Sequence, residues 1–470
     1  MKFCENPFKY AYLAPQGEVR PCPWMHITLG NLYEEDIADI WHSPAAETAR
    51  ESIRNGSFAF CRKTSCHFLE KDELPDLSEA EFAQKAKATD LPVYINIAND
   101  LTCNIACTTC RKAVYCPEEG EKEKIDSALE DILPVANQAE LLELNGYGEF
   151  LANPSFIRLL NRLEPVRDDF KILLETNGVL SDENHWERFS HLSKYDLRVT
   201  VTLNSLRRDV YRYLSGGFDH RDRVLENLRF LSKLRREEKI NLLSVTMVVQ
   251  DCNFWEVPEY ISTLSDEREF MFDTIMMKPL YKWYKMDEET YWFKNILNPQ
   301  HPYHKSYLKI LEDDCWKNSK VYDWGCHNIR ESIPHPLKQE EIYRKILSRI
   351  YDNDEGLMPV DYLKKCVDRL GAKRIGFYGK NEFSIEFAKL LKETGVEIFQ
   401  ITWALEDCCG EFTKVAKQDF RPDMADAMLI IDFFKGGYWF KDLRALGYRG
   451  PLMTVEDFVL QREHEAGESV

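Results

Sequence analysis

Three cysteines within eight residues form the stretch of this sequence with the clearest chemistry: Cys103, Cys107 and Cys110, in the spacing C-x3-C-x2-C. Thiolates this close together suit soft metals, and cysteine-rich runs are how proteins hold iron–sulfur clusters. Three ligands leave one iron of a four-iron cluster without a protein ligand. An incompletely ligated metal is typical of a catalytic site rather than a structural one.

A zinc site is the alternative interpretation of the same triplet, because three thiols and a fourth nearby ligand also complete tetrahedral zinc. Cys116 is the candidate for that fourth ligand. Under this alternative the protein is a non-enzymatic zinc-binding scaffold or sensor. Metal analysis that finds zinc without iron or sulfide would favour it.

A second set of four cysteines lies in the first seventy residues: Cys4, Cys22, Cys61 and Cys66. Four sulfurs suffice for one fully ligated iron–sulfur cluster or for one zinc ion. An acidic segment that contains a proline follows at residues 72–76. The capping-box sequence Ser78-Glu79-Ala80-Glu81 then predicts a helix to about residue 89, so we expect a domain boundary here.

Strand and helix patterns alternate from residue 91 to about residue 278. The expected strands are residues 93–98, 139–144, 170–174, 197–203, 242–249 and 273–277, and helical spacing occurs between them, as in 154–164 and 223–235. Six strands with intervening helices predict a parallel α/β sheet curved into a partial barrel. Sites in such folds gather at the C-terminal ends of the strands, and the cysteine triplet follows the first strand.

The loops after the next strands carry glycine and polar residues at the same expected edge. In chain order they are Asn145-Gly146-Tyr147-Gly148-Glu149, Glu175-Thr176-Asn177-Gly178, Leu203-Asn204-Ser205, and the segment from Val248 to Asn253. Glycine lets the backbone approach a ligand closely, and a carboxylate suits an ammonium group. A polar ligand is therefore expected beside the cysteines.

The cysteine triplet followed by these loops in this order resembles the radical SAM superfamily. One departure is Thr109, where most members have an aromatic residue before the third cysteine. The resemblance implies a partial (β/α)6 barrel in which Cys103, Cys107 and Cys110 hold a [4Fe–4S] cluster and S-adenosylmethionine (SAM) binds the open iron. The SAM contacts that it implies are Gly146, Gly148, Glu149, Thr176, Asn177, Asn204, Ser205, Val248 and Asn253.

The first seventy residues resemble the SPASM domain, an auxiliary-cluster module. The matching residues are Cys4, Gly17-x4-Cys22, Gly30-Asn31-Leu32 with Ile40-Trp41, and Cys61-x4-Cys66. Two features depart from the usual pattern: the module precedes the catalytic domain, and it has four cysteines rather than seven. The resemblance implies one auxiliary [4Fe–4S] cluster held by Cys4, Cys22, Cys61 and Cys66.

The last two hundred residues carry weaker signals. Residues 281–370 are expected to be a helical connector, in which Cys315 and Cys326 are simply buried. Residues 371–462 resemble a Rossmann-like α/β domain, with strands at 374–379, 396–401 and 427–432 and a helix at 383–394. Lys380, Asn381 and Glu382 break its glycine pattern, so a docking or structural role is expected, and the adjacent Cys408 and Cys409 are left unassigned.

Composition excludes several classes of function. The formal charge of −18, from 79 acidic and 61 basic residues, opposes nucleic-acid binding. No apolar run is long enough to span a membrane, and the N-terminus lacks the apolar core of a signal peptide. We therefore expect a cytoplasmic protein whose fourteen cysteines bind metal rather than form disulfides.

These interpretations predict four parts: a SPASM-like domain (1–75), a radical SAM core (90–280), a helical connector (281–370) and a Rossmann-like domain (371–462). The family resemblance implies reductive cleavage of SAM to a 5′-deoxyadenosyl radical, which abstracts a hydrogen atom from a substrate. That substrate is either a peptide or protein, or a small molecule such as a sugar or its nucleotide conjugate. The resemblance also implies an electron donor such as flavodoxin or ferredoxin.

Overall fold

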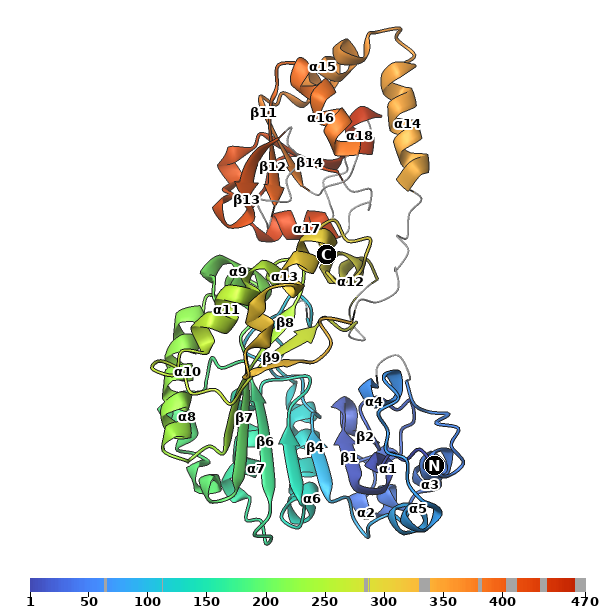
Figure 1. Cartoon of the computed structure of the whole chain (residues 1–470), viewed down its shortest axis with the longest axis vertical. Coiled ribbons are helices and arrows are strands. Elements are labelled where there is room, and N and C mark those ends of the chain that lie inside the picture. The colour runs from blue at the N-terminus through green and yellow to red at the C-terminus, as the bar shows by residue number, and fades with distance from the viewer. Residues whose placement is uncertain are drawn as a thin grey trace.

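The computed structural model describes residues 1–62, 66–111, 113–282, 286, 288–328, 339–378, 383–402, 412–431 and 438–460. Two sheets organise the chain, with the second stacked beyond one end of the first (Figure 1). The broken glycine pattern, Gly379 with Lys380, Asn381 and Glu382, lies outside the described residues, as do Cys408 and Cys409.

The main sheet has ten strands in the order β10-β9-β8-β7-β6-β5-β4-β1-β2-β3. Their bounds are β1 Tyr10–Leu13, β2 Glu18–Arg20, β3 Gly30–Asn31, β4 Tyr94–Ile97, β5 Leu141–Leu144, β6 Lys171–Thr176, β7 Asp196–Thr202, β8 Leu242–Val249, β9 Thr274–Pro279 and β10 Val321–Asp323. Strands β4 to β9 are all parallel and neighbour one another in chain order. The predicted α/β class with six parallel strands is confirmed.

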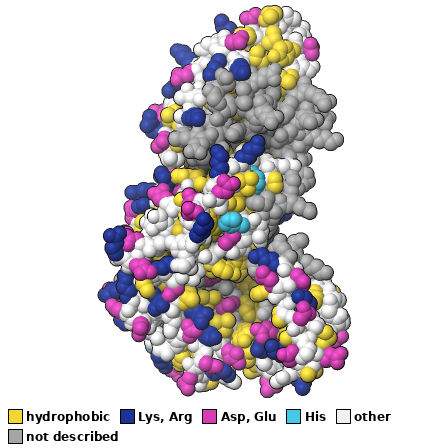
Figure 2. Space-filling model, viewed as in Figure 1, with side chains coloured by type: hydrophobic (Ala, Val, Ile, Leu, Met, Phe, Trp, Pro, Cys, Tyr) yellow, Lys and Arg dark blue, Asp and Glu magenta, His cyan; other side chains and the backbone are white. Residues whose placement is uncertain are grey.

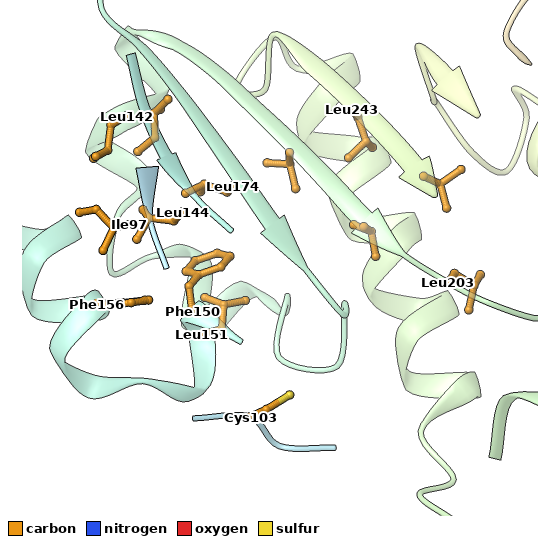
Figure 3. Close-up of a cluster of buried hydrophobic side chains, with 14 of the residues drawn as sticks. Ile97, Cys103, Leu142, Leu144, Phe150, Leu151, Phe156, Leu174, Leu203 and Leu243 are labelled. Atoms are coloured by element: carbon orange, nitrogen blue, oxygen red, sulfur yellow. The ribbon is translucent and has the colours of Figure 1, made fainter. Parts of the chain in front are cut away.

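Helices follow the strands and cover the outer face of this sheet (Figure 1). Their bounds are α6 Glu119–Ala136, α7 Pro154–Arg162, α8 Glu183–Trp186, α9 Arg208–Leu214, α10 Arg221–Arg236 and α11 Val257–Leu264. The alternation of the strands explains the packing, because Ile97, Leu142 and Leu174 face these helices in one hydrophobic cluster (Figure 3). The residues between them, such as Asn96, Glu143 and Glu175, face the concave side.

The sheet is curved, as the predicted partial barrel requires. Glu175 on β6 and Lys278 on β9 lie on strands separated by β7 and β8. Their side chains nevertheless approach to 3.9 Å between Oε1 and Nζ. Strands are about 4.8 Å apart in a sheet, so this contact can form only across the concave face.

The N-terminal cysteine-rich region is continuous with the main sheet. Strand β1 pairs in parallel with β4, and β2 and β3 continue antiparallel beyond it. Its helices are α1 Asn6–Lys9, α2 Ile37–Trp41, α3 Pro44–Arg54 and α4 His67–Glu70. Trp41 and Ile40 are fully buried and share the hydrophobic core of the barrel. The region is therefore built onto the barrel edge rather than tethered to it.

The predicted capping box is present. Ser78 Oγ accepts from the Glu81 backbone N–H, and Glu81 accepts from the Ser78 N–H, at the start of α5 (Glu79–Lys85). The helix ends at Lys85, four residues before the expected end at residue 89.

The segment expected to be a helical connector differs from that prediction. It contains α12 (Glu288–Lys294), α13 (His304–Leu311) and also strand β10, which pairs in parallel with β9. Three residues are too few for a periodic pattern, so the sequence did not indicate this strand. Helices α14 (Gln339–Tyr351) and α15 (Pro359–Leu370) share a core with the C-terminal sheet, where Ile346, Ile350 and Tyr362 are fully buried.

The C-terminal sheet has five parallel strands in the order β13-β12-β11-β14-β15. Its elements are β11 Arg374–Tyr378, α16 Phe383–Glu393, β12 Glu397–Thr402, β13 Thr413–Ala416, β14 Ala427–Ile430, α17 Tyr438–Ala445, β15 Leu452–Thr454 and α18 Val455–Val459. With β11 in the centre and the chain winding outward both ways, the order is Rossmann-like, as predicted.

Candidate functional site

One large cavity, of about 3280 Å³, joins three parts of the chain. Cys107 and Cys110 line it, and so do all four cysteines of the N-terminal region. Side chains of the C-terminal domain, among them Lys417 and Asp442, line its other end. A small-molecule pocket usually measures about 300–1,000 Å³, so this cavity has room for more than one ligand.

The cysteine triplet lies on a loop that is fixed by the backbone after α9. The Ala106 N–H donates to Ser215 O at 3.2 Å, and the Thr108 N–H donates to Leu214 O at 3.0 Å. Gly216 makes this approach possible, since a Cβ there would lie 2.0 Å from Ala106 O and its φ is +79°. The loop is thus held at the C-terminal edge of β4, where the sequence predicted it.

The three thiols lie close enough to affect one another electrostatically. Burial raises the pKa of Cys107 to about 12, and the charges of Cys110 and Cys103 act in the same direction. Arg111 adds a positive charge that no sequence motif indicated. Its Nη2 lies 3.5 Å from Cys110 Sγ and also donates to Tyr147 O. A fixed positive charge beside three sulfurs stabilises their thiolate forms.

The N-terminal sulfurs also converge, with N–H groups directed at one of them. Cys22 Sγ accepts from Asn6 Nδ2 at 3.6 Å and from the Trp24 N–H at 3.4 Å. Charge on Cys66 and Cys61 raises the pKa of Cys22, after the larger effect of burial. Hydrogen bonds to sulfur are typical of cluster-ligating thiolates, so this donor set fits an iron–sulfur cluster.

A single metal ion fits these sulfurs less well. Among the residues that the structure describes, no three His, Cys, Asp or Glu side chains are placed to hold a metal ion. Sulfurs around one zinc ion would be roughly 3.8 Å apart, because the Zn–S bond is about 2.3 Å. Cys116, the candidate fourth zinc ligand, is exposed.

The loop after β5 is split between the cavity and the interior. Asn145, Gly146 and Tyr147 line the cavity, whereas Gly148 packs its backbone against Asp100 O and Thr102 O. Glu149 is only 2% exposed. We expected its carboxylate to face the SAM ammonium, but it faces inward instead.

Glu149 is fully engaged by neighbouring loops. Its carboxylate accepts from Thr176 Oγ1 at 2.8 Å, the Asn177 N–H at 2.6 Å and the Leu151 N–H at 3.3 Å. Burial raises its pKa to about 7. Glu149 therefore ties the loops after β5 and β6 together beneath the cavity floor.

The predicted site residues after β6 are also turned away from the cavity. Thr176 is buried under Glu149. The Asn177 side chain donates to Asn104 Oδ1 at 2.7 Å, and its Nδ2 lies 3.9 Å from Cys103 Sγ. Cys103 itself is buried beside the hydrophobic cluster under the barrel helices (Figure 3). Asn177 thus positions the first cysteine of the triplet.

Four of the residues predicted to contact SAM lie at or just after the C-terminal ends of β7 and β8. Asn204 and Val248 line the cavity. Ser205 and Asn253 are fully buried and do not line it. Ser205 donates to Glu256 at 2.8 Å, and Asn253 Nδ2 donates to Asn204 O at 2.7 Å, so both stabilise the loops that carry the lining residues.

Polar side chains from the strands themselves also line the cavity, and apart from Glu175 none of them belongs to a motif that the sequence indicated. They are Tyr10, Tyr12, Asn96, Glu143, Glu175, Thr202, Thr246 and Lys278. The available signal was a polar residue at alternate positions of strands whose other positions are apolar. Such alternation places polar groups on the concave face. Cys315 and Cys326 do not line this cavity.

Comparison with known families agrees with this geometry. Residues 4–67 match the model of the SPASM family, described as an iron–sulfur cluster-binding domain, and residues 101–264 match the radical SAM superfamily. The chain thus carries a SPASM domain followed by a radical SAM domain. The cofactors of such domains are SAM and iron–sulfur clusters, one that binds SAM and an auxiliary one.

Two solved structures show a weak likeness. The crystal structure of Streptococcus suis SuiB bound to S-adenosylmethionine shares 13% identity, with 68% of this chain and 66% of that chain covered and a TM-score of 0.33. Pyruvate kinase from Pyrobaculum aerophilum shares 10% identity, with 69% and 62% covered and a TM-score of 0.21. Both TM-scores are low, so neither likeness supports a functional statement. No curated protein matches the chain.

The chain therefore contains a radical SAM domain preceded by a SPASM domain, and this domain composition supports an enzyme. Within the described part of the chain, no helix has the length and apolar character to cross a bilayer. On the face shown in Figure 2, basic and acidic side chains are interspersed rather than gathered into a basic region.

Proposed function

We propose that the enzyme cleaves SAM reductively at a [4Fe–4S] cluster that Cys103, Cys107 and Cys110 would hold. The resulting radical would then react with a substrate in the cavity. The observation that carries this proposal is that Cys107 and Cys110 line the same cavity as Asn204 and Val248. When bound, the [4Fe–4S] cluster supplies the electron that converts SAM to methionine and a 5′-deoxyadenosyl radical. The protein's own residues bind, orient and shield the reactants.

The roles of individual residues follow from their positions. Asn145, Gly146 and Tyr147 line the same cavity as the cysteines, and the backbone carbonyl groups of Asn145 and Gly146 are suited to the SAM ammonium. Asn204 and Val248 are suited to the ribose and adenine, since both line the cavity, Asn204 just after β7 and Val248 near the end of the adjacent strand β8. Glu149, Ser205 and Asn253 hold these loops from below.

The auxiliary cluster is proposed to lie at the other side of the same cavity, held by Cys4, Cys22, Cys61 and Cys66. All four line it. An electron donor such as flavodoxin or ferredoxin is proposed as the partner that reduces the SAM-binding cluster. The substrate, a peptide or protein or else a sugar, would occupy the space between the two cysteine sets.

The test is production of 5′-deoxyadenosine from SAM by anaerobically reconstituted protein with a strong reductant. Wild type should form it, and the variant with Cys103, Cys107 and Cys110 all changed to Ala should not. Cys315→Ala is the matched control, because Cys315 does not line the cavity, and it should match wild type. Equal product from the triple variant would refute the assignment.

A further inference from the structure

The concave face of the barrel contains buried polar atoms that no described residue satisfies. Asn96 on β4 is 3% exposed, and Thr246 on β8 is 2% exposed. Both residues line the cavity, yet Asn96 Oδ1 and Thr246 Oγ1 have no hydrogen-bond partner. Buried polar atoms are nearly always paired, so these two indicate a polar ligand in the lumen.

Glu143 on β5 adds a carboxylate beside Asn96. Its Oε2 accepts from Tyr10 Oη at 3.1 Å and from Asn96 Nδ2 at 2.8 Å. Because Nδ2 points at Glu143, the Asn96 carbonyl oxygen must point elsewhere, into the cavity. None of the described residues donates to Glu143 Oε1, which leaves a second carboxylate oxygen available there.

Glu175 and Lys278 complete the polar surface from the other side. Their 3.9 Å contact crosses the lumen, and Lys278 Nζ lies 5.5 Å from the ring centroid of Trp324, which also lines the cavity. Glu175 lies near enough to Glu143 to raise the pKa of Glu143, after the larger effect of burial. The two carboxylates therefore face one shared space.

These groups are mainly hydrogen-bond acceptors. Asn96 Oδ1 and the two carboxylates only accept, Thr246 Oγ1 can do both, and Lys278 is the one charged donor among these five side chains. A ligand that satisfies them must bring several hydrogen-bond donors. Hydroxyl groups on a saturated ring provide such a set, and the ring's apolar face can pack on an aromatic side chain such as Trp324.

An extended peptide fits this lumen less well. Peptides commonly bind by adding a strand to a free sheet edge. Strand β4, which carries Asn96, is paired on both sides, by β1 and by β5, and β8 is paired by β7 and β9. The lumen offers side chains rather than a strand edge.

We infer that the lumen is a substrate subsite for a hydroxyl-rich ring, a sugar or sugar conjugate, bound through Asn96, Glu143 and Thr246. This inference rests on the proposed function, because it places the reacting group beside the radical site. Of the two substrate classes named above, a peptide or protein and a sugar, the inference selects the sugar.

Binding can be measured without turnover, by saturation-transfer NMR on the purified full-length protein. The probes are methyl glucoside, methyl galactoside, methyl mannoside and N-acetylglucosamine. At least one should bind to wild type. Glu143→Gln should weaken its binding about ten- to hundredfold, and Thr246→Val about two- to tenfold, as expected for losing a charged and a neutral hydrogen bond.

Thr200→Val is the matched control. Thr200 is a buried threonine on β7 that does not line the cavity, so its loss should leave glycoside binding unchanged. Thr246→Val keeps the side-chain shape, so it tests the inference even if Glu143→Gln does not fold. SAM affinity, measured by equilibrium dialysis, should be the same in Thr246→Val and wild type.

Three results would overturn the inference. The first is that no glycoside probe binds to wild type. The second is that peptides from a tryptic digest of casein bind instead and lose affinity in Thr246→Val. The third is that SAM affinity falls in Thr246→Val, which would assign these atoms to the cofactor. If the protein forms 5′-deoxyadenosine but binds no glycoside, the proposed function stands and only the sugar subsite is refuted. If glycoside binding depends on Thr246 but the protein forms no 5′-deoxyadenosine, the sugar subsite stands and the proposed function is refuted.

Discussion

Buried carboxylates, rather than cofactor-facing ones, organise the loops around this site. Glu149 ties the loops after β5 and β6, and Glu256 does the same after β7 by accepting from Ser205 Oγ and the N–H groups of Leu206 and Arg207. Each is at most 2% exposed. A carboxylate that satisfies several loop N–H groups fixes their geometry, and removing it leaves buried donors unpaired.

Glu256 should make stability depend on pH. Burial raises its pKa to about 8 from 4.5, so the folded state holds the proton more tightly than the unfolded chain. The contribution is fully present below pH 4.5 and is lost as the pH rises through about 8. Urea unfolding at several pH values between 5 and 8 should show wild type losing stability relative to Glu256→Gln.

Glu259→Gln is the control for this experiment, since Glu259 lies in the first turn of α11, directly after Glu256, and is exposed. Its pH profile should run parallel to wild type. If Glu256→Gln also runs parallel to wild type, the Glu256 carboxyl does not titrate in this range.

At the residue scale, the sequence predicted the place of the site better than the orientation of its side chains. Cys107 and Cys110 do meet Gly146, Asn204 and Val248 at one cavity, whereas Cys103 does not line it. Glu149 and Ser205 belong to the right loops but face inward. Local sequence cannot tell a buried glutamate from a ligand-facing one, because the direction of a side chain depends on packing between loops that are distant in sequence.

Elements distant in sequence build the site, and strand β1 is the clearest case. Its residues Tyr10 and Tyr12 line the lumen although they belong to the SPASM domain. The parallel strands β4 to β9 were predictable from six apolar runs. The pairing of β1 with β4 was not, because four buried residues carry no signal of their partner eighty residues away.

The junction between the cysteine loop and the end of α9 should tolerate no side chain at Gly216. Its φ is +79°, and an added Cβ would lie 2.0 Å from Ala106 O, which is backbone that cannot move without shifting Cys107. We expect Gly216→Ala to reduce the iron content of anaerobically reconstituted protein by about one cluster per chain.

Gly217→Ala separates this clash from backbone strain. Gly217 also has a positive φ, +97°, but nothing lies within 4 Å of its added Cβ. That variant should lose about 1–2 kcal/mol of stability from the left-handed backbone and keep its iron. Equal iron loss in both variants would show that strain, not contact with the cysteine loop, is the cause.

At the scale of the whole molecule, Cys107 and Cys110 line one cavity with the four N-terminal cysteines, although the two sets belong to different domains. Changing Cys4, Cys22, Cys61 and Cys66 to Ala should therefore remove the auxiliary cluster alone. Iron analysis should show about eight atoms per wild-type chain and about four in the variant, which should still convert SAM to 5′-deoxyadenosine. Full iron content in the variant would remove these cysteines from the ligand set.

The C-terminal domain joins the cavity through buried charges. Lys417 Nζ lies 2.5 Å from Asp442 Oδ2, and both side chains are 1% exposed. The Lys417 ammonium also lies 4.0 Å from the ring centroid of Tyr213, on α9 of the barrel. Tyr378, at the end of β11, donates to the same Asp442 carboxylate. The C-terminal edge of the Rossmann-like sheet thus meets the radical SAM domain through one polar network.

Removing one charge of this network should lower the stability more than removing both charges together. Asp442→Asn removes from the buried Lys417 ammonium the carboxylate that it contacts directly, and loss of one partner of a buried pair costs about 3–5 kcal/mol. Burial already lowers the pKa of Lys417, so the uncompensated charge is the unfavourable element. Lys417→Met combined with Asp442→Asn removes that charge and should recover most of the stability. Urea unfolding, followed by tryptophan fluorescence and by circular dichroism, measures the stability of each variant. The control is Lys365→Met, which removes the exposed ion pair between Lys365 and Glu355. A double variant no more stable than Asp442→Asn would show that the pair itself, and not the isolated ammonium, determines the stability of this junction.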